Sequence, residues 1–147
     1  MPESWYGLVN GDEDLMQGDF IYECPIVVPA VAKFGEGMTI EATVKNYNVI
    51  IMSQSCDMKY KKVKLVLVCP FWPLEEYTKK YTHLKSDNSK EAMRRGYNPG
   101  NHLLAKCELD RFRKDDYLVV EFKSVFSVPL DYISEKAKLQ DKRLRLK

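Results

Sequence analysis

The stretch Val49-Ile50-Ile51-Met52-Ser53-Gln54-Ser55-Cys56-Asp57 decides much of the fold, because an apolar run passes directly into a polar one. Four consecutive apolar residues, three of them β-branched, predict a strand that is covered on both faces. The polar residues that follow predict a turn or loop displayed at the end of that strand. Sites for binding and catalysis are often built in this way on a rigid scaffold.

Other strand-like segments lie on both sides of this stretch. They are rich in Val, Ile, Tyr and Phe and are bounded by Gly, Pro, Asn or Asp. With His102–Cys107 as a short addition, they are Asp19–Cys24, Ile26–Val31, Met38–Val44, Val49–Gln54, Val63–Cys69 and Tyr117–Phe122. Leu65–Cys69 resembles Val49–Met52 in being continuously apolar, so it is also expected to be covered on both faces.

The segment Met38–Val44 carries a second kind of pattern. Apolar and polar residues alternate along it, which predicts a strand with one buried face and one solvent-exposed face. The preceding Gly35-Glu36-Gly37 predicts a tight turn. The sequence as a whole therefore predicts a mainly β fold, a small and mostly antiparallel barrel with helical decorations.

Residues 74–100 interrupt the strands. Apolar residues recur at helical spacing from Leu74 to Leu84, and Ser86–Ser89 predicts the cap of a second helix over Lys90–Arg95. A basic C-terminal helix is expected over Asp131–Lys147. We expect one domain, with an acidic lead-in (1–15), barrel strands (16–73), a helical insertion around 74–95 that continues as a loop to 100, closing strands (101–133) and a basic tail helix (134–147).

Charge is distributed unevenly along the 147 residues, although the formal net charge is only +2. Residues 1–44 hold eight acids and one base, whereas residues 45–147 hold 22 bases and 13 acids. Such a polarised chain favours an acidic partner for its basic part, such as nucleic acid. A related hypothesis is that the acidic first 20 residues cover the basic face, within the chain or between copies.

Cysteine and histidine form no pattern typical of a metal site. The four cysteines include no CxxC pair, and neither His83 nor His102 has metal-ligand spacing. We therefore expect reduced thiols, no metal and no cofactor. The N-terminus lacks the basic start and apolar core of a signal peptide, and the longest apolar run is too short for a membrane span. A cytoplasmic protein without a membrane partner is expected.

Three segments, in order, resemble the MazF/PemK-like family of plasmid-maintenance toxins. They are Gly18-Asp19-Phe20-Ile21, Val49–Ser53 and Val66–Pro70. In that family a Gly-Asp opening strand precedes a hydrophobic strand that ends in Ser and another that runs into Pro. The resemblance spans roughly a third of the chain, and it implies an SH3-like barrel and a role in a toxin–antitoxin or phage-defence system.

The catalytic residues of that family are not matched. The family has an Arg-Pro pair before the second strand, and its Arg serves RNA cleavage, whereas this chain has Asn46-Tyr47-Asn48 there. The family's Pro-x-Thr element is replaced by Pro70-Phe71-Trp72. The resemblance thus implies the barrel without the ribonuclease mechanism. The Ser-Gln-x-Cys-Asp segment also resembles a group of small bacterial proteins of uncharacterised activity, as do residues 117–133.

Cys56, Asp57 and His102 are the candidate catalytic residues. A cysteine nucleophile needs a base, and His102 can serve only if the fold brings it close to Cys56. Asp57 with Gln54 could instead hold a ligand. The structural alternatives are that Cys56 is a small buried residue and that Asp57 caps the turn. If the strand continued through this segment, Asp57 would point away from the thiol.

A second set of residues indicates nucleic-acid binding. Lys and Arg neutralise phosphates, and aromatic rings stack on unpaired bases. The candidates for phosphate contact are Lys59, Lys61, Lys62, Arg94 and Arg95, and those for stacking are Tyr77 and Tyr97. The alternative is a solvated lysine-rich surface with acids interspersed.

Three functions follow from these patterns. The leading hypothesis is a non-catalytic or catalytically divergent barrel that binds RNA, DNA or a partner protein of the same system, with a homodimer left open. The second is a nuclease- or hydrolase-like enzyme around Cys56 and Asp57. The third is a protein–protein adaptor that docks through its tail or an edge strand.

Overall fold

The computed structural model describes residues 4–109 and 116–147, and in these ranges the chain is mainly β, as the sequence predicts. The strands are β1 (Tyr6–Asn10), β2 (Phe20–Lys33), β3 (Thr39–Ile51), β4 (Leu65–Pro73), β5 (Asn101–Leu104), β6 (Leu118–Glu121), β7 (Phe126–Pro129) and β8 (Lys142–Leu146). The helices are α1 (Ser55–Lys59), α2 (Leu74–Lys80), α3 (Asp87–Arg95) and α4 (Leu130–Lys138), with a 3-10 turn over Thr82–Leu84.

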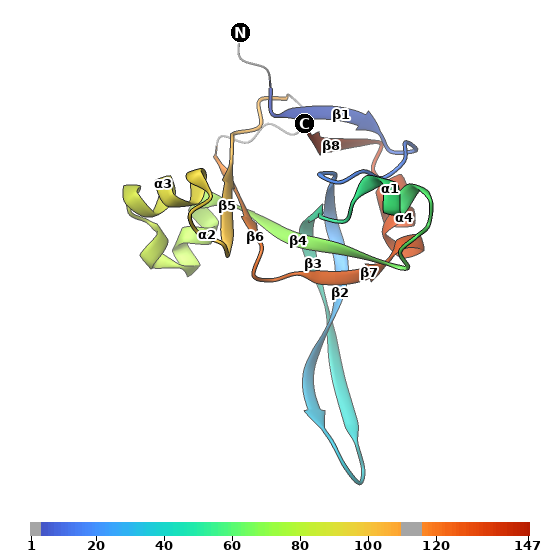
Figure 1. Cartoon of the computed structure of the whole chain (residues 1–147). Coiled ribbons are helices and arrows are strands. Elements are labelled where there is room, and N and C mark those ends of the chain that lie inside the picture. The colour runs from blue at the N-terminus through green and yellow to red at the C-terminus, as the bar shows by residue number, and fades with distance from the viewer. Residues whose placement is uncertain (1–3, 110–115) are drawn as a thin grey trace.

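The strands are antiparallel, but within the described residues they do not close into the expected barrel. Six of them form one sheet in the order β2-β3-β4-β6-β5, with β7 also paired to β4, and β1 pairs separately with β8. The β1–β8 pair lies across the end of the larger sheet (Figure 1). Backbone hydrogen bonds from Gly18 to Ile51 and from Leu146 to Gly18, each 2.9 Å long, connect the two sheets.

The predicted short strands merge into two long ones. β2 takes in the segments expected at Asp19–Cys24 and Ile26–Val31, and β3 takes in Met38–Val44 and the start of Val49–Gln54. A bulge at Glu23, whose φ is +52°, shifts the pairing register of β2 with β3, and β2 continues through it.

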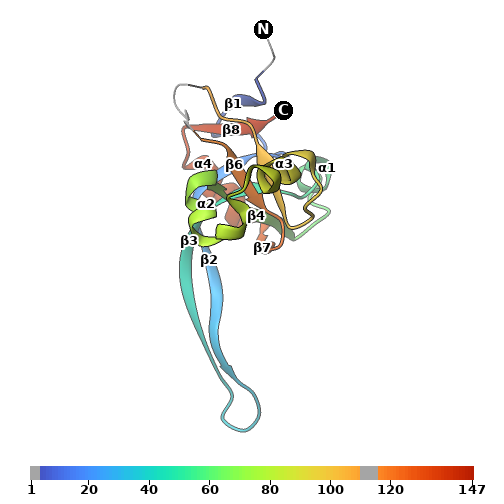
Figure 2. The ribbon, with the colours of Figure 1, turned by 90° about the vertical axis from the view of Figure 1, so that its left-hand side faces the viewer.

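The outer part of the β2–β3 hairpin, residues 27–45, is here called the arm. In two views at right angles it projects far from the rest of the molecule (Figures 1 and 2). The turn predicted at Gly35-Glu36-Gly37 forms its tip, where both glycines have positive φ and the Met38 N–H donates to the Gly35 carbonyl.

The helical insertion is confirmed. Ser86 caps α3 by accepting a hydrogen bond from the backbone N–H of Ser89, and Gly96 ends it in the left-handed conformation. The helix begins at Asp87, three residues before the predicted start. The apolar residues of this insertion pack with one end of β5 and β6, in a cluster of Leu74, Tyr77, Leu84, Met93, Leu103 and Val119.

Four local predictions are wrong. The acidic lead-in contains strand β1, and the tail helix stops at Lys138, after which the alternating Arg and Leu of Lys142–Leu146 form strand β8 against β1. Residues Ser55–Lys59 form the short helix α1 where a loop or turn is expected. In β4, Leu65 and Leu67 are exposed, so that strand is covered on one face only along its first half.

Asp19 is fully buried, and its carboxylate accepts hydrogen bonds from two arginines of β8. The Nε of Arg143, also fully buried, donates to Asp19 Oδ2 at 2.9 Å, and the Nε of Arg145 donates to Oδ1 at 2.5 Å. The remaining Arg143 nitrogens donate to the carbonyls of Gly11, Glu13 and Asp14. The start of β2, strand β8 and the acidic turn at 11–14 are therefore held together at one carboxylate.

We expect Asp19→Asn to lower the free energy of unfolding by about 3–5 kcal/mol, because it leaves two arginines without their carboxylate in a buried site. Urea denaturation followed by circular dichroism measures this loss. In the control Glu135→Gln, which breaks the exposed pair with Lys138, the change should stay below about 1 kcal/mol. Equal effects of the two substitutions would contradict the role assigned to Asp19.

Stability should also fall in alkali. Burial, with a smaller contribution from Cys107, raises the pKa of Tyr22 from its ordinary value of 10.0 to about 12. Between these values the unfolded chain releases the proton and the folded chain keeps it, so the free energy of unfolding decreases as pH rises. Urea titrations across this window should show a shallower decrease for Tyr22→Phe. The exposed Tyr60→Phe is the control, and the idea fails if both variants match the unsubstituted protein.

Candidate functional site

The two serines of the Ser-Gln-Ser-Cys-Asp segment hold the backbone at the end of β3. Ser53 Oγ accepts a hydrogen bond from the Leu67 N–H of β4, and Ser55 Oγ accepts one from the Gln17 N–H, both at 2.9 Å. The side chain of Gln17 also donates to the Met52 carbonyl at 2.8 Å. These contacts fix the point at which β3 ends and α1 begins.

The other three side chains of the segment lie together. Cys56 Sγ is 3.9 Å from Gln54 Oε1 and 3.9 Å from Asp57 Oδ1, and its side chain is exposed. The alternative of a small buried cysteine is therefore wrong. Asp57 reaches the thiol because the strand has already ended and both residues lie in α1. Both neighbouring atoms are hydrogen-bond acceptors, so neither supplies the nitrogen base of a cysteine nucleophile.

His102 is not brought to Cys56. It lies on β5, near the left end of β4 in Figure 1, whereas α1 lies near the right end of that strand. Its ring stacks on Phe122, with 6.3 Å between the ring centroids. His102 also lines a largely apolar cavity of about 480 Å³ together with Trp5, Met52 and Leu146. In the described residues no hydrogen bond or ring contact joins His102 to Cys56, so the predicted nucleophile–base pair is not formed.

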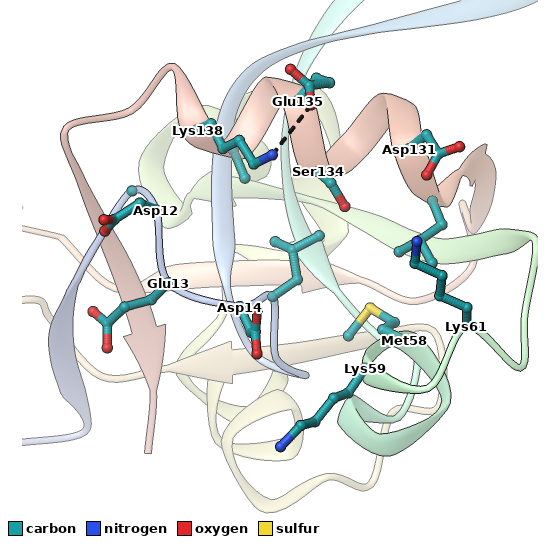
Figure 3. A pocket seen from close by; sticks show the side chains of 14 residues that line it. Asp12, Glu13, Asp14, Met58, Lys59, Lys61, Asp131, Ser134, Glu135 and Lys138 are labelled. Carbon is teal, nitrogen blue, oxygen red and sulfur yellow. Dashed lines mark hydrogen bonds and ion pairs between the residues drawn. The ribbon is translucent and has the colours of Figure 1, made fainter.

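A cleft of about 330 Å³ lies between the turn at 11–15, α1 and α4 (Figure 3). Its charged lining mixes both signs: Asp12, Glu13, Asp14, Asp131 and Glu135 with Lys59, Lys61 and Lys138. The acidic lead-in and the lysines that follow the Cys-Asp segment therefore line one cleft. This arrangement is the one expected if the acidic residues cover these lysines. In the described residues no group of three His, Cys, Asp or Glu side chains is arranged to hold a metal ion.

The seven residues predicted to contact nucleic acid do not form one face. Lys59, Lys61 and Lys62 lie on or just after α1, whereas Arg94, Arg95 and Tyr97 lie on or just after α3, on the other side of the molecule (Figure 1). The ammonium groups of Lys59 and Lys62 lie about 6 Å from the ring of Tyr60.

Both arginines of α3 are engaged locally. The Nε of Arg94 donates to Glu91 at 2.8 Å and the Nε of Arg95 at 2.6 Å, and these hydrogen bonds lower the pKa of Glu91 to about 2. Both guanidinium groups remain more than half exposed. They are therefore positive groups that already have an internal counterion.

Tyr77 does not present its ring for stacking. The residue is 3% exposed, and its hydroxyl donates to Asn101 Oδ1 within the cluster beneath α2 and α3. Burial raises the pKa of this hydroxyl well above its ordinary value. The stacking role predicted for Tyr77 therefore does not fit the structure, and its recurrence at helical spacing with Leu74 and Leu84 is typical of a core-facing residue.

The most conspicuous surface feature is the arm, which the sequence prediction treated as half-buried. Opposite residues in an antiparallel pair lie on the same face, and Val27 pairs with Val44 and Pro29 with Ala42. The side chains of this face and of the tip are exposed over most of their area: Val27 66%, Phe34 79%, Met38 60%, Ile40 57% and Val44 65%. The alternation in Met38–Val44 is real, but among the described residues nothing buries its apolar side.

Comparison with known proteins gives no relative. No family model, curated protein or solved structure matches the chain. The resemblance to MazF/PemK-like toxins therefore stays a prediction. Among residues 4–109 and 116–147, no helix has the length and apolar character needed to cross a membrane.

The exposure of Cys56 predicts selective modification. Cys24 and Cys69 are buried, and burial raises the pKa of the Cys69 thiol to about 11. We expect iodoacetamide to alkylate Cys56 at least about tenfold faster than either in the folded protein, because the reactive thiolate there is accessible. Peptide mass spectrometry over time measures each site. Cys56→Ser should remove the fast phase and keep the melting temperature, and equal rates at the three sites would contradict the description.

Proposed function

We propose that this chain is a protein-binding module and that the apolar face of the arm is its contact surface. The observation that carries the proposal is the continuous exposure of Val27, Phe34, Met38, Ile40 and Val44 on a ribbon that leaves the body. Single exposed apolar residues are ordinary, but a contiguous apolar patch on a soluble protein marks a contact surface.

The stability of an isolated ribbon supports the same function. A two-stranded hairpin is marginally stable in water, and it gains stability when a further layer covers its apolar face. β3 pairs with β4 only at Val49, Ile50 and Ile51, which lie outside the arm. Within the described residues, no third strand of the larger sheet pairs with the arm. Contact with another protein would supply the missing layer.

The distribution of prolines favours contact through the face over strand addition to the β2 edge. Pro25 and Pro29 both lie in β2 and have no N–H to donate. A strand added along that edge would therefore lack two hydrogen bonds. The apolar face, in contrast, needs only a complementary apolar surface.

The chemistry of the arm favours protein over nucleic acid. Residues 27–45 contain two lysines and two glutamates, so the arm offers no excess of positive charge to a phosphate backbone. The enzyme hypothesis has less support, because the side chains beside the Cys56 thiol are those of Gln54 and Asp57.

Photo-crosslinking at neighbouring positions of one strand tests this proposal. A benzoylphenylalanine at Ala42 lies on the apolar face, and one at Thr43 lies on the opposite face of the same exposed ribbon. In cells that make the protein, we expect at least about threefold more protein adduct from position 42 than from position 43, since interfaces bury one face.

Lys79, which is exposed on α2, is the control position on the body, and a crosslinker there measures non-specific adducts. Adducts from position 42 that do not exceed those from positions 43 and 79 would overturn the proposal. Mass spectrometry of the adducts identifies the bound protein, including this chain itself.

A further inference from the structure

We infer that the protein bound by the arm is a second copy of this chain, with the two apolar faces packed against each other. This inference rests on the proposed function and specifies its partner. Each copy offers the same patch, so the contact is isologous and generates a two-fold dimer that leaves no patch uncovered.

The sidedness of the ribbon suits this arrangement. The apolar face holds the Val27–Val44 and Pro29–Ala42 pairs and Ile40, whereas Thr39, Glu41, Thr43 and Lys45 follow the opposite face of β3. Two such ribbons stacked face to face form a small two-layer sandwich, about 10 Å between layers, with the polar residues of β3 on the outer faces.

The charges of the arm favour an identical partner over a strongly charged one. Lys33, Glu36, Glu41 and Lys45 balance, so two arms approach without net repulsion. In the stacked arrangement Glu41 and Lys45 stay on the outer faces, and no ionised group on those strands has to be desolvated. A highly acidic or basic partner would find no complementary charge on the apolar face.

The size of the patch is also adequate. An exposed aliphatic or aromatic side chain presents on the order of 100 Å² of apolar surface, the area that corresponds to the usual free energy of burying such a side chain. Val27, Phe34, Met38, Ile40 and Val44 therefore expose about 500 Å² on each arm, so two arms would bury about 1,000 Å² in total, which is the lower limit for a specific interface. A contact limited to the tip would use less than half of this surface.

Sedimentation velocity on the purified full chain, over a range of micromolar concentrations, tests the inference. We expect a species of twice the monomer mass. Ile40→Glu should weaken its dissociation constant at least about tenfold, because a carboxylate would enter the apolar layer. The matched control Thr43→Glu places the same charge on the outer face of the same strand and should keep the dimer.

Circular dichroism melts confirm that both variants fold, as expected for exposed positions outside the core clusters. A dimer that responds equally to the two substitutions would overturn face-to-face packing. A monomer at all concentrations, together with position-42 adducts to a different protein, would overturn the second copy and leave the protein-binding proposal intact. A monomer with no face-specific adducts would overturn both.

Discussion

The carboxylate of Asp19 holds together parts of the chain that are 124 residues apart. A buried carboxylate is costly to desolvate, and here two arginines and the N–H of Met16 satisfy its oxygens. Arg143 in turn satisfies three carbonyls of the acidic turn. This arrangement attaches the β1–β8 pair to the larger sheet, and it fixes Gln17, whose hydrogen bonds hold the start of α1. The Cys-Asp segment is therefore hydrogen-bonded to a residue that lies two positions before the salt-bridged Asp19.

The same strand that begins at this anchored end carries the arm at its other end. Phe20, Ile21 and Cys24 of β2 are fully buried, whereas Val27 of the same strand is exposed. Because β2 and β3 are continuous through the boundary, the body sets the direction of the ribbon. The fold thus separates two tasks: buried apolar and ionic contacts define the body, and an uncovered apolar face is displayed by it.

Alternation and run length in the sequence predict the strands, the insertion and the turn at Gly35-Glu36-Gly37, because these depend on local backbone preference. They do not predict which apolar face is covered, since that depends on where the strand ends relative to the rest of the sheet. Met38–Val44 has the pattern of a half-buried strand and lies in the arm. Likewise, Lys142–Leu146 alternates Arg with Leu, and its partner β1 is far away in the sequence. Whether distant side chains such as Cys56 and His102 come into contact is likewise set by topology.

The structure shows which of the unevenly distributed charged residues are paired with one another. The arginines of β8 are neutralised by Asp19 and by carbonyls of the acidic turn, and those of α3 are bonded to Glu91. Lys59 and Lys61 line a cleft with Asp12–Asp14. The four arginines of α3 and β8 are therefore bonded to acceptors within the chain. The arm gathers five of the large apolar side chains that are exposed in the described residues, which is why we assign contact with a partner to the arm.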